Sequence, residues 1–186
     1  MPIRLGQRPD HSFENPLGLL SDCHRRIERF LDVLILVAEQ AANTPLTSEQ
    51  REALEGALRY FRVAAPKHTQ DEEASLFPRL RQLDQAAVRE AMGKLDQLEA
   101  DHDEADRAHA RVEEIASQWL RDGTLPAELG AKLSSLLRDL RELYLRHIAV
   151  EDRELFPLAG RVLDPAQLAS VGREMAQRRG IRTDGR

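Results

Sequence analysis

The segment His147–Pro157, HIAVEDRELFP, and its near-copy His68–Pro78, HTQDEEASLFP, decide the fold of this chain. In both segments a histidine is followed four residues later by a glutamate, Glu72 or Glu151, and each segment closes with Leu-Phe-Pro. Residues i and i+4 of an α-helix lie on one face, about 6 Å apart along the axis, so each imidazole and its carboxylate can converge on one point. Two such helices packed face to face could enclose a pair of metal ions.

The composition around these segments is typical of a helical protein. Only 4% of the 186 residues are aromatic and 32% are charged. Ala, Leu, Arg and Glu, which favour helices, are abundant. Because a chain of this length suffices for one well-buried domain, we expect a single all-α domain.

Sequence signals predict where five helices begin. Asn15-Pro16 places a proline at the first helical position, and Thr47–Gln50 matches a capping box. Asp84 is the expected N-cap of the third helix, the fourth is expected after Pro126, and Asp164-Pro165 opens a short fifth helix. Apolar residues recur every three or four positions along the first four, so each is expected to bury one stripe.

Other signals predict where these helices end or bend. The turn at Asn43–Pro45 stops the first helix, and Pro66 should kink the second just before His68. Pro78 should bend or end that helix, Asp122-Gly123 ends the third, and Gly180 ends the fifth after about Arg179.

The helices form two similar halves. His68 and His147 are 79 residues apart, and His24 and His102 are 78 apart, so one αα-hairpin repeats the ligand layout of the other. Two such hairpins predict an up-down-up-down four-helix bundle. We expect an N-terminal arm over residues 1–14, the bundle over 15–160, and a C-terminal helix and tail over 161–186.

Four of the six histidines fall on the buried stripes, one per helix: His24, His68, His102 and His147. Each could be an ordinary core histidine with a hydrogen-bond partner. Together with Glu72 and Glu151, however, they would place six ionisable groups at one level, which costs several kcal/mol unless something compensates. A pair of metal ions is the expected compensation.

The donor types indicate which metal to expect. Cys23 is the only cysteine, so a cysteine zinc site is excluded, whereas imidazoles with two carboxylates that can bridge favour a dinuclear site. Iron is the natural candidate for oxygen chemistry, and the donor set leaves zinc and manganese open.

These residues resemble those of hemerythrin-like, HHE cation-binding proteins. The resemblance rests on His24, His102 and the two His-x-x-x-Glu segments, and it spans residues 16–158. It implies a four-helix bundle with two non-haem iron ions, Glu72 and Glu151 as bridging ligands and the four histidines as terminal ligands. It also implies binding of, or reaction with, oxygen, nitric oxide or peroxide.

Asp106 is a departure from the oxygen-carrying members of that family, which have a second histidine at this place. Asp106 could bind metal through its carboxylate, or leave an exchangeable position open. Open positions are where metals react, so the resemblance favours oxidation, sensing or metal transfer over oxygen carriage.

Several neighbours of the site have plainer expected roles. His109 is read as a core histidine or a hydrogen-bond partner of the ligands, and Tyr144 as a wall residue whose hydroxyl could bond near the site. Cys23 is read as a packed thiol. Three acidic residues are expected on solvated faces, with the last two as substitute ligands if the register slips: Asp71, Glu73 and Asp152.

The basic tail is expected to complement a helix C-terminus, not to bind nucleic acid. It contains Arg173, Arg178, Arg179, Arg182 and Arg186. A net charge of −5 also argues against nucleic acid as a partner, and no apolar run is long enough to span a membrane. Without a secretion signal, the cytoplasm is the expected location.

Three functions fit these features. The first is a non-haem di-iron protein that senses or reacts with oxygen, nitric oxide or peroxide. The second is an iron donor that repairs damaged iron-sulfur clusters, although the cysteine-bearing N-terminal segment of many such relatives is absent. The third is a metal-stabilised structural or regulatory module without redox turnover. The sequence does not identify a protein partner.

Overall fold

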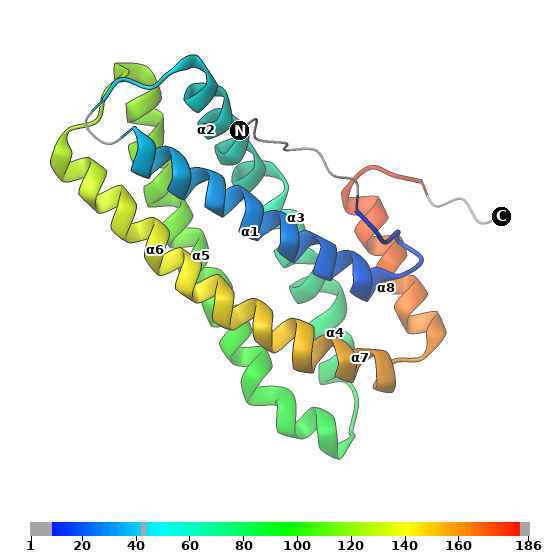
Figure 1. Ribbon diagram of the computed structural model, residues 1–186. Coiled ribbons are helices and arrows are strands. Elements are labelled where there is room, and N and C mark those ends of the chain that lie inside the picture. The colour runs from blue at the N-terminus through cyan, green and yellow to red at the C-terminus, as the bar shows by residue number, and fades with distance from the viewer. Residues whose placement is uncertain (1–8, 42–43, 183–186) are drawn as a thin grey trace.

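The computed structural model describes residues 9–41 and 44–182, and these ranges are almost entirely helical, without a β-strand (Figure 1). The elements are α1 (Pro16–Gln40), α2 (Ser48–Val63), α3 (Ala65–Asp71), the π-helical turn η1 (Glu72–Leu76), α4 (Phe77–Arg81), α5 (Ala86–Asp122), α6 (Ala127–Val150), the π-helical turn η2 (Glu151–Leu155), α7 (Phe156–Val162) and α8 (Pro165–Arg178).

The elements form four antiparallel rods, namely α1, α2 to α4, α5, and α6 with α7 (Figure 1). Each rod packs against its neighbours in a ring, through the pairs α1–α2, α2–α5, α5–α6 and α1–α6. α8 packs outside this ring, against α1, α3 and η1. The predicted all-α, up-down-up-down bundle with a short C-terminal helix is therefore confirmed.

Three of the predicted helix starts have the expected caps. The side chains of Asn15, Thr47 and Asp164 accept hydrogen bonds from backbone amides in the first turns of α1, α2 and α8. The prediction for Asp84 was wrong, because Gln85 is the N-cap of α5 and makes no side-chain cap bond. Asp84 instead pairs with Arg89, one turn into the helix.

The predicted break at Pro66 is present between α2 and α3. A proline lacks the amide hydrogen, and its ring clashes with the carbonyl four positions back, here that of Arg62, so the helical ladder is interrupted at Ala64 and restarts. The equivalent position in the second hairpin is Leu145, and α6 accordingly runs without interruption.

The Leu-Phe-Pro sequences lie at the ends of the two π-helical turns. The amide of Phe77 donates to the carbonyl of Glu72, and the amide of Phe156 donates to that of Glu151, each across five residues. A proline one residue later would clash with the carbonyl four positions back in a regular α-helix. The wider turn relieves this crowding, so the rod continues beyond each proline instead of ending.

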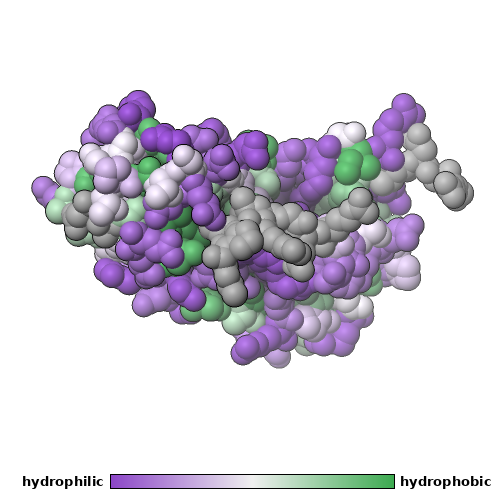
Figure 2. Space-filling model, turned by 45° about the horizontal axis from the view of Figure 1, so that its top comes forward, coloured by the Kyte–Doolittle hydropathy of each residue, from purple (hydrophilic) through white to green (hydrophobic). Residues whose placement is uncertain are grey.

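The apolar core is divided into two clusters along the bundle. One contains Ile27, Phe61 and Trp119, and the other contains Leu20, Leu95 and residues of α8. The exterior face in Figure 2 is mostly hydrophilic, with only scattered apolar side chains. Among the described residues, no helix is long and apolar enough to cross a membrane.

Some predictions fall partly outside the described residues: Asn43, residues 1–8 of the arm and residues 183–186 of the tail, which include Arg186. The division into arm, bundle and tail stays a prediction. The described end of the arm nevertheless contacts the folded part, because Phe13 lies against α8 at Gly172.

We expect Gly172→Ala to lower the free energy of unfolding by about 1–3 kcal/mol, the usual effect of overpacking. A Cβ at Gly172 would lie 2.0 Å from the Phe13 carbonyl oxygen. Gly93→Ala in α5 is the matched control, since its Cβ would meet nothing within 4 Å. Urea unfolding should show the control gaining roughly 0.5–1 kcal/mol from helix propensity. Equal effects at both sites would contradict the close packing of α8.

Candidate metal site

The structure brings together six side chains from the four rods, in the layer between the two apolar clusters. Both glutamates are 0% exposed, and none of the four histidines is more than 7% exposed. Each glutamate is the first residue of a π-helical turn, directly beyond the helix that carries the paired histidine. The six are His24, His68, Glu72, His102, His147 and Glu151.

Their donor atoms form two overlapping groups, and within each group the atoms lie within 4.8 Å of one another. One group joins His24 and His68 to both glutamates, and the other joins His102 and His147 to the same two glutamates. Both carboxylates are thus shared. Two cations could be held side by side, each by two imidazoles and bridged by Glu72 and Glu151.

The shortest contacts follow this division. Glu72 lies 3.4 Å through Oε1 from His68 Nε2 and 3.4 Å through Oε2 from His102 Nε2. Glu151 Oε2 lies 3.0 Å from His24 Nε2 and 3.1 Å from His147 Nε2. Each glutamate therefore has its shortest contacts with one histidine of each group, an arrangement compatible with a bridging carboxylate.

The cluster fits a metal because its donors lack other partners. Both carboxylate oxygens of Glu72 and Glu151 are buried without a hydrogen bond among the described residues, and so are the Nε2 atoms of His24 and His102. Buried polar atoms of this kind are normally satisfied. Cations bound between them would satisfy the carboxylates and the imidazoles together.

Three of the histidines are oriented by outer carboxylates. Asp152 Oδ1 lies 3.0 Å from Nδ1 of His24, and Glu73 Oε1 lies 2.8 Å from Nδ1 of His102. Asp101 Oδ2 lies 3.4 Å from Nδ1 of His147. Such partners fix the tautomer that leaves Nε2 free to bind metal.

The expectation that Glu73 and Asp152 lie on solvated faces holds in part, because their side chains are 38% and 34% exposed, but each also contacts a cluster imidazole. Neither residue belongs to the two donor groups, so neither lies where a substitute ligand would. Each instead contacts the Nδ1 atom of an imidazole. Asp101 was not among the residues predicted from the sequence. The sequence contains a signal for Asp101, because each of the three outer carboxylates is next in sequence to one of the six cluster residues.

Asp71 was also expected on a solvated face, and this was wrong. It is 0% exposed and pairs with Arg178 and Arg179 of the C-terminal region. These arginines also lie at a helix C-terminus as predicted, because Arg178 is in the last turn of α8 and Arg179 is its C-cap and donates to the Met175 carbonyl. Cys23 is buried as a free thiol, as expected, and burial raises its pKa.

The metal-free cluster has unequal proton affinities. Burial lowers the pKa of His68 to about 4. Burial also acts to lower the pKa of His102, but Glu72, Glu151 and Glu73 outweigh it and raise that pKa to about 9. The carboxylates of Asp152 and Glu151 outweigh burial in the same way and hold the pKa of His24 well above its usual value.

The two glutamates have the opposite shift. Burial acts to raise the pKa of both, and for Glu151 the charge of Glu72 adds to this. The surrounding imidazoles outweigh these effects, so the pKa of each glutamate lies below its usual value.

A small cavity of about 20 Å³ borders the cluster, and all four cluster histidines line it. Its wall includes Tyr144, whose hydroxyl lies 3.0 Å from Nε2 of His109. His109 also stacks on Phe61 with ring centroids 4.1 Å apart. His109 is thus a core histidine bonded to the wall residue, as expected for both.

Asp106 lines the same cavity but is exposed and belongs to neither donor group. Metal binding by Asp106 therefore stays a prediction.

This fold and this cluster define a helical bundle protein with a candidate site for metal cations. The family model described as hemerythrin HHE cation binding domain matches residues 15–159. The chain therefore belongs to the hemerythrin HHE cation-binding family. An uncharacterized protein of Haemophilus influenzae (strain Rd) is 26% identical over 175 residues, which cover 92% of this chain and 94% of that protein.

We expect His109→Gln to change how stability depends on pH in the metal-free protein. Burial lowers the pKa of His109 from 6.5 to about 4, so the folded protein binds fewer protons than the unfolded chain between these values. Stability should fall as the pH drops through this window, by up to about 3 kcal/mol from this residue. The variant should lose less, so urea unfolding at several pH values should show wild type falling relative to it. If the free energy of unfolding depends on pH in the same way in both proteins, the lowered pKa of His109 is contradicted.

Proposed function

We propose that the cluster holds two non-haem iron ions and that the protein senses or reacts with oxygen, nitric oxide or peroxide. The observation that carries this proposal is the pair of fully buried glutamates, shared by two histidine pairs and left without hydrogen bonds. Membership of a cation-binding family supports the same reading.

The donor set favours iron. Nitrogen and carboxylate oxygen donors suit iron, and the Cys23 thiol belongs to neither donor group. Zinc and manganese accept the same donors, so the choice of metal is a question for the experiment. When bound, iron would supply a centre that changes between ferrous and ferric states.

The side chains of the chain have separate tasks in this proposal. The Nε2 atoms of the four histidines bind the ions, and Glu72 and Glu151 hold the pair together. The outer carboxylates keep Nδ1 protonated and the rings oriented. The apolar clusters on both sides exclude bulk water from the layer.

The cavity favours a small partner. A space of about 20 Å³ can admit roughly one molecule of the size of water. Diatomic gases and peroxide are of suitable size, whereas a larger organic substrate would require the helices to separate. This supports oxygen, nitric oxide or peroxide as the partner over oxidation of a bulky compound.

The testing experiment is anaerobic reconstitution with ferrous iron. We expect two irons per chain and a new visible charge-transfer absorption after oxygen or nitric oxide is added. His68→Ala should reduce the iron content and weaken the absorption, whereas Lys132→Ala, at an exposed position on α6 fifteen residues before His147, should leave both unchanged.

The rival functions predict different results. Less than one iron per chain, or no spectral response, would refute the proposal. Tight binding of zinc that raises the melting temperature without any gas response would favour the structural module. Rapid transfer of bound iron to an acceptor protein would favour an iron donor.

We also expect Glu73→Gln to weaken metal binding by about 10- to 100-fold, the usual effect of removing a carboxylate that orients a metal-bound histidine. Glu73 contacts Nδ1 of His102. Glu104→Gln is the matched control, because Glu104 is exposed on the same helix as His102. Competition with a coloured chelator measures both. Equal affinity for the two variants would show that Glu73 does not orient the ring.

A further inference from the structure

α8 contacts the ligand-bearing rod although it lies beyond residue 159, where the family match ends. Arg178 Nη1 donates to Asp71 Oδ1 at 2.8 Å, and Arg179 Nη2 donates to Asp71 Oδ2 at 2.7 Å. Arg178 also donates to Ser75 Oγ at 2.6 Å. We call these four residues, Asp71, Ser75, Arg178 and Arg179, the clamp.

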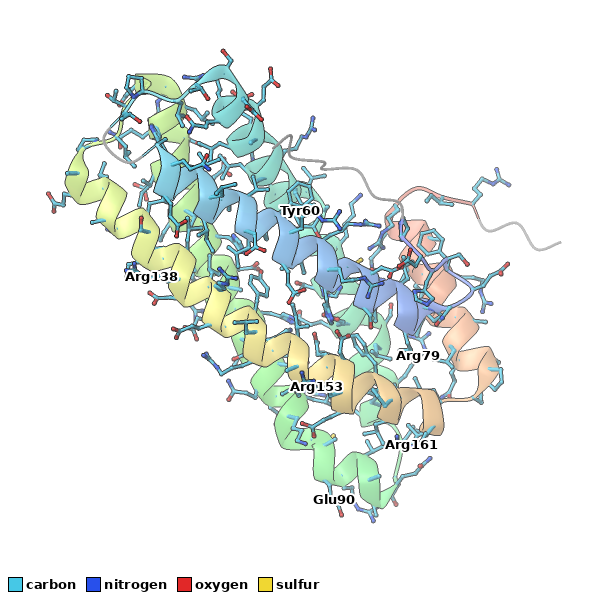
Figure 3. All side chains as sticks on the ribbon, in the orientation of Figure 1. Tyr60, Arg79, Glu90, Arg138, Arg153 and Arg161 are labelled. Atoms are coloured by element: carbon cyan, nitrogen blue, oxygen red, sulfur yellow. The ribbon has the colours of Figure 1, made fainter. Side chains whose placement is uncertain are left out.

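A second ion pair joins α8 to the same rod. Arg79 donates to both carboxylate oxygens of Glu174, at 3.1 and 2.6 Å, and to the Ser75 carbonyl at 2.7 Å. In Figure 3, Arg79 lies between the bundle and α8. α8 is therefore attached on the side of the rod that carries the clamp.

The clamp lies directly beside two cluster residues. Asp71 precedes Glu72 and follows His68 by three positions, and Ser75 lies within the same π-helical turn as Glu72. Among the described residues, His68 is the one cluster histidine whose Nδ1 has no hydrogen-bond partner. Its ring is consequently positioned by the backbone of α3, not by an outer carboxylate.

The second hairpin shows why this segment requires external support. α6 runs unbroken to His147, whereas α3 is a seven-residue piece separated from α2 at Pro66. The positions equivalent to Asp71 and Ser75 are Val150 and Glu154, which cannot reproduce the clamp. Only the interrupted segment is bound to α8 in this way.

We propose that Arg178 and Arg179, acting through Asp71, position His68 and Glu72, so that the metal ion between His24 and His68 is retained only while α8 is docked. The inference rests on the proposed metal site but not on the identity of the metal. A buried carboxylate is costly without its partners, so docking of α8 and order in α3 depend on each other.

The first test uses the full chain loaded with cobalt(II), whose visible spectrum reports on coordination, and a chelator added in excess. In Arg178→Ala/Arg179→Ala we expect the ion held by His68 to leave about 10- to 100-fold faster, while the other ion, which shares only Glu72 with the clamped segment, is accelerated much less. Arg173→Ala is the matched control, because Arg173 is exposed on α8 and donates to Ser170 of the same helix.

The same release measurement in a His68→Ala background tests whether the clamp acts by positioning His68 or by a general loosening of the bundle. If the clamp acts through His68, the arginine substitutions should add little to the release rate once His68 is gone. Fully additive effects, or equal acceleration of both ions, would overturn the proposal.

The second test needs no metal. Amide exchange over residues 65–77 of the metal-free protein should become faster in the double arginine variant while α5 keeps its protection. Asp71→Asn should speed amide exchange over the same residues, and it leaves no buried carboxylate charge. It therefore tests the clamp if the double arginine variant does not fold. Unchanged exchange and release in Asp71→Asn would refute the clamp. A wild-type chain that binds no cobalt would instead contradict the proposed function, whatever the exchange result.

Discussion

The structure depends on the burial of two glutamates and four histidines in one layer of the bundle. Apolar clusters cover this layer on both sides, so its charges cannot be hydrated by bulk water. Every rod must keep a fixed register for the six donor groups to meet, because a shift of one residue turns a helical side chain by about 100°. The outer carboxylates and the clamp are the local means by which this register is kept.

The two π-helical turns show how the sequence meets that constraint. Glu72 and Glu151 both stand where the backbone widens, and each is followed by a proline at the same distance. One chemical pattern therefore supplies both the carboxylate and the local geometry that lets the rod continue. The halves differ at Pro66, which interrupts only one of them.

Much of this could be predicted from the sequence, because helical periodicity and the repeated His-x-x-x-Glu are local signals. They predict that His24 and Glu151 lie on the buried stripes of two facing helices. Asp71 was misjudged because its burial depends on arginines more than 100 residues away, and no local pattern reports such a contact. The N-cap of α5 was misplaced by one residue because Asp84 and Gln85 are adjacent polar residues. The extended residue directly before the helix is Gln85.

The proton affinities of the metal-free cluster have a consequence for how the site is filled. The surrounding carboxylates raise the pKa of His24 and His102, so these imidazoles hold protons more strongly than ordinary histidines, and they face two glutamates whose pKa is lowered. Incoming cations must displace those protons, since a protonated imidazole has no lone pair for a metal. Metal binding at the proposed site would thus exchange protons for metal, and acidification of the surroundings would favour release of the metal.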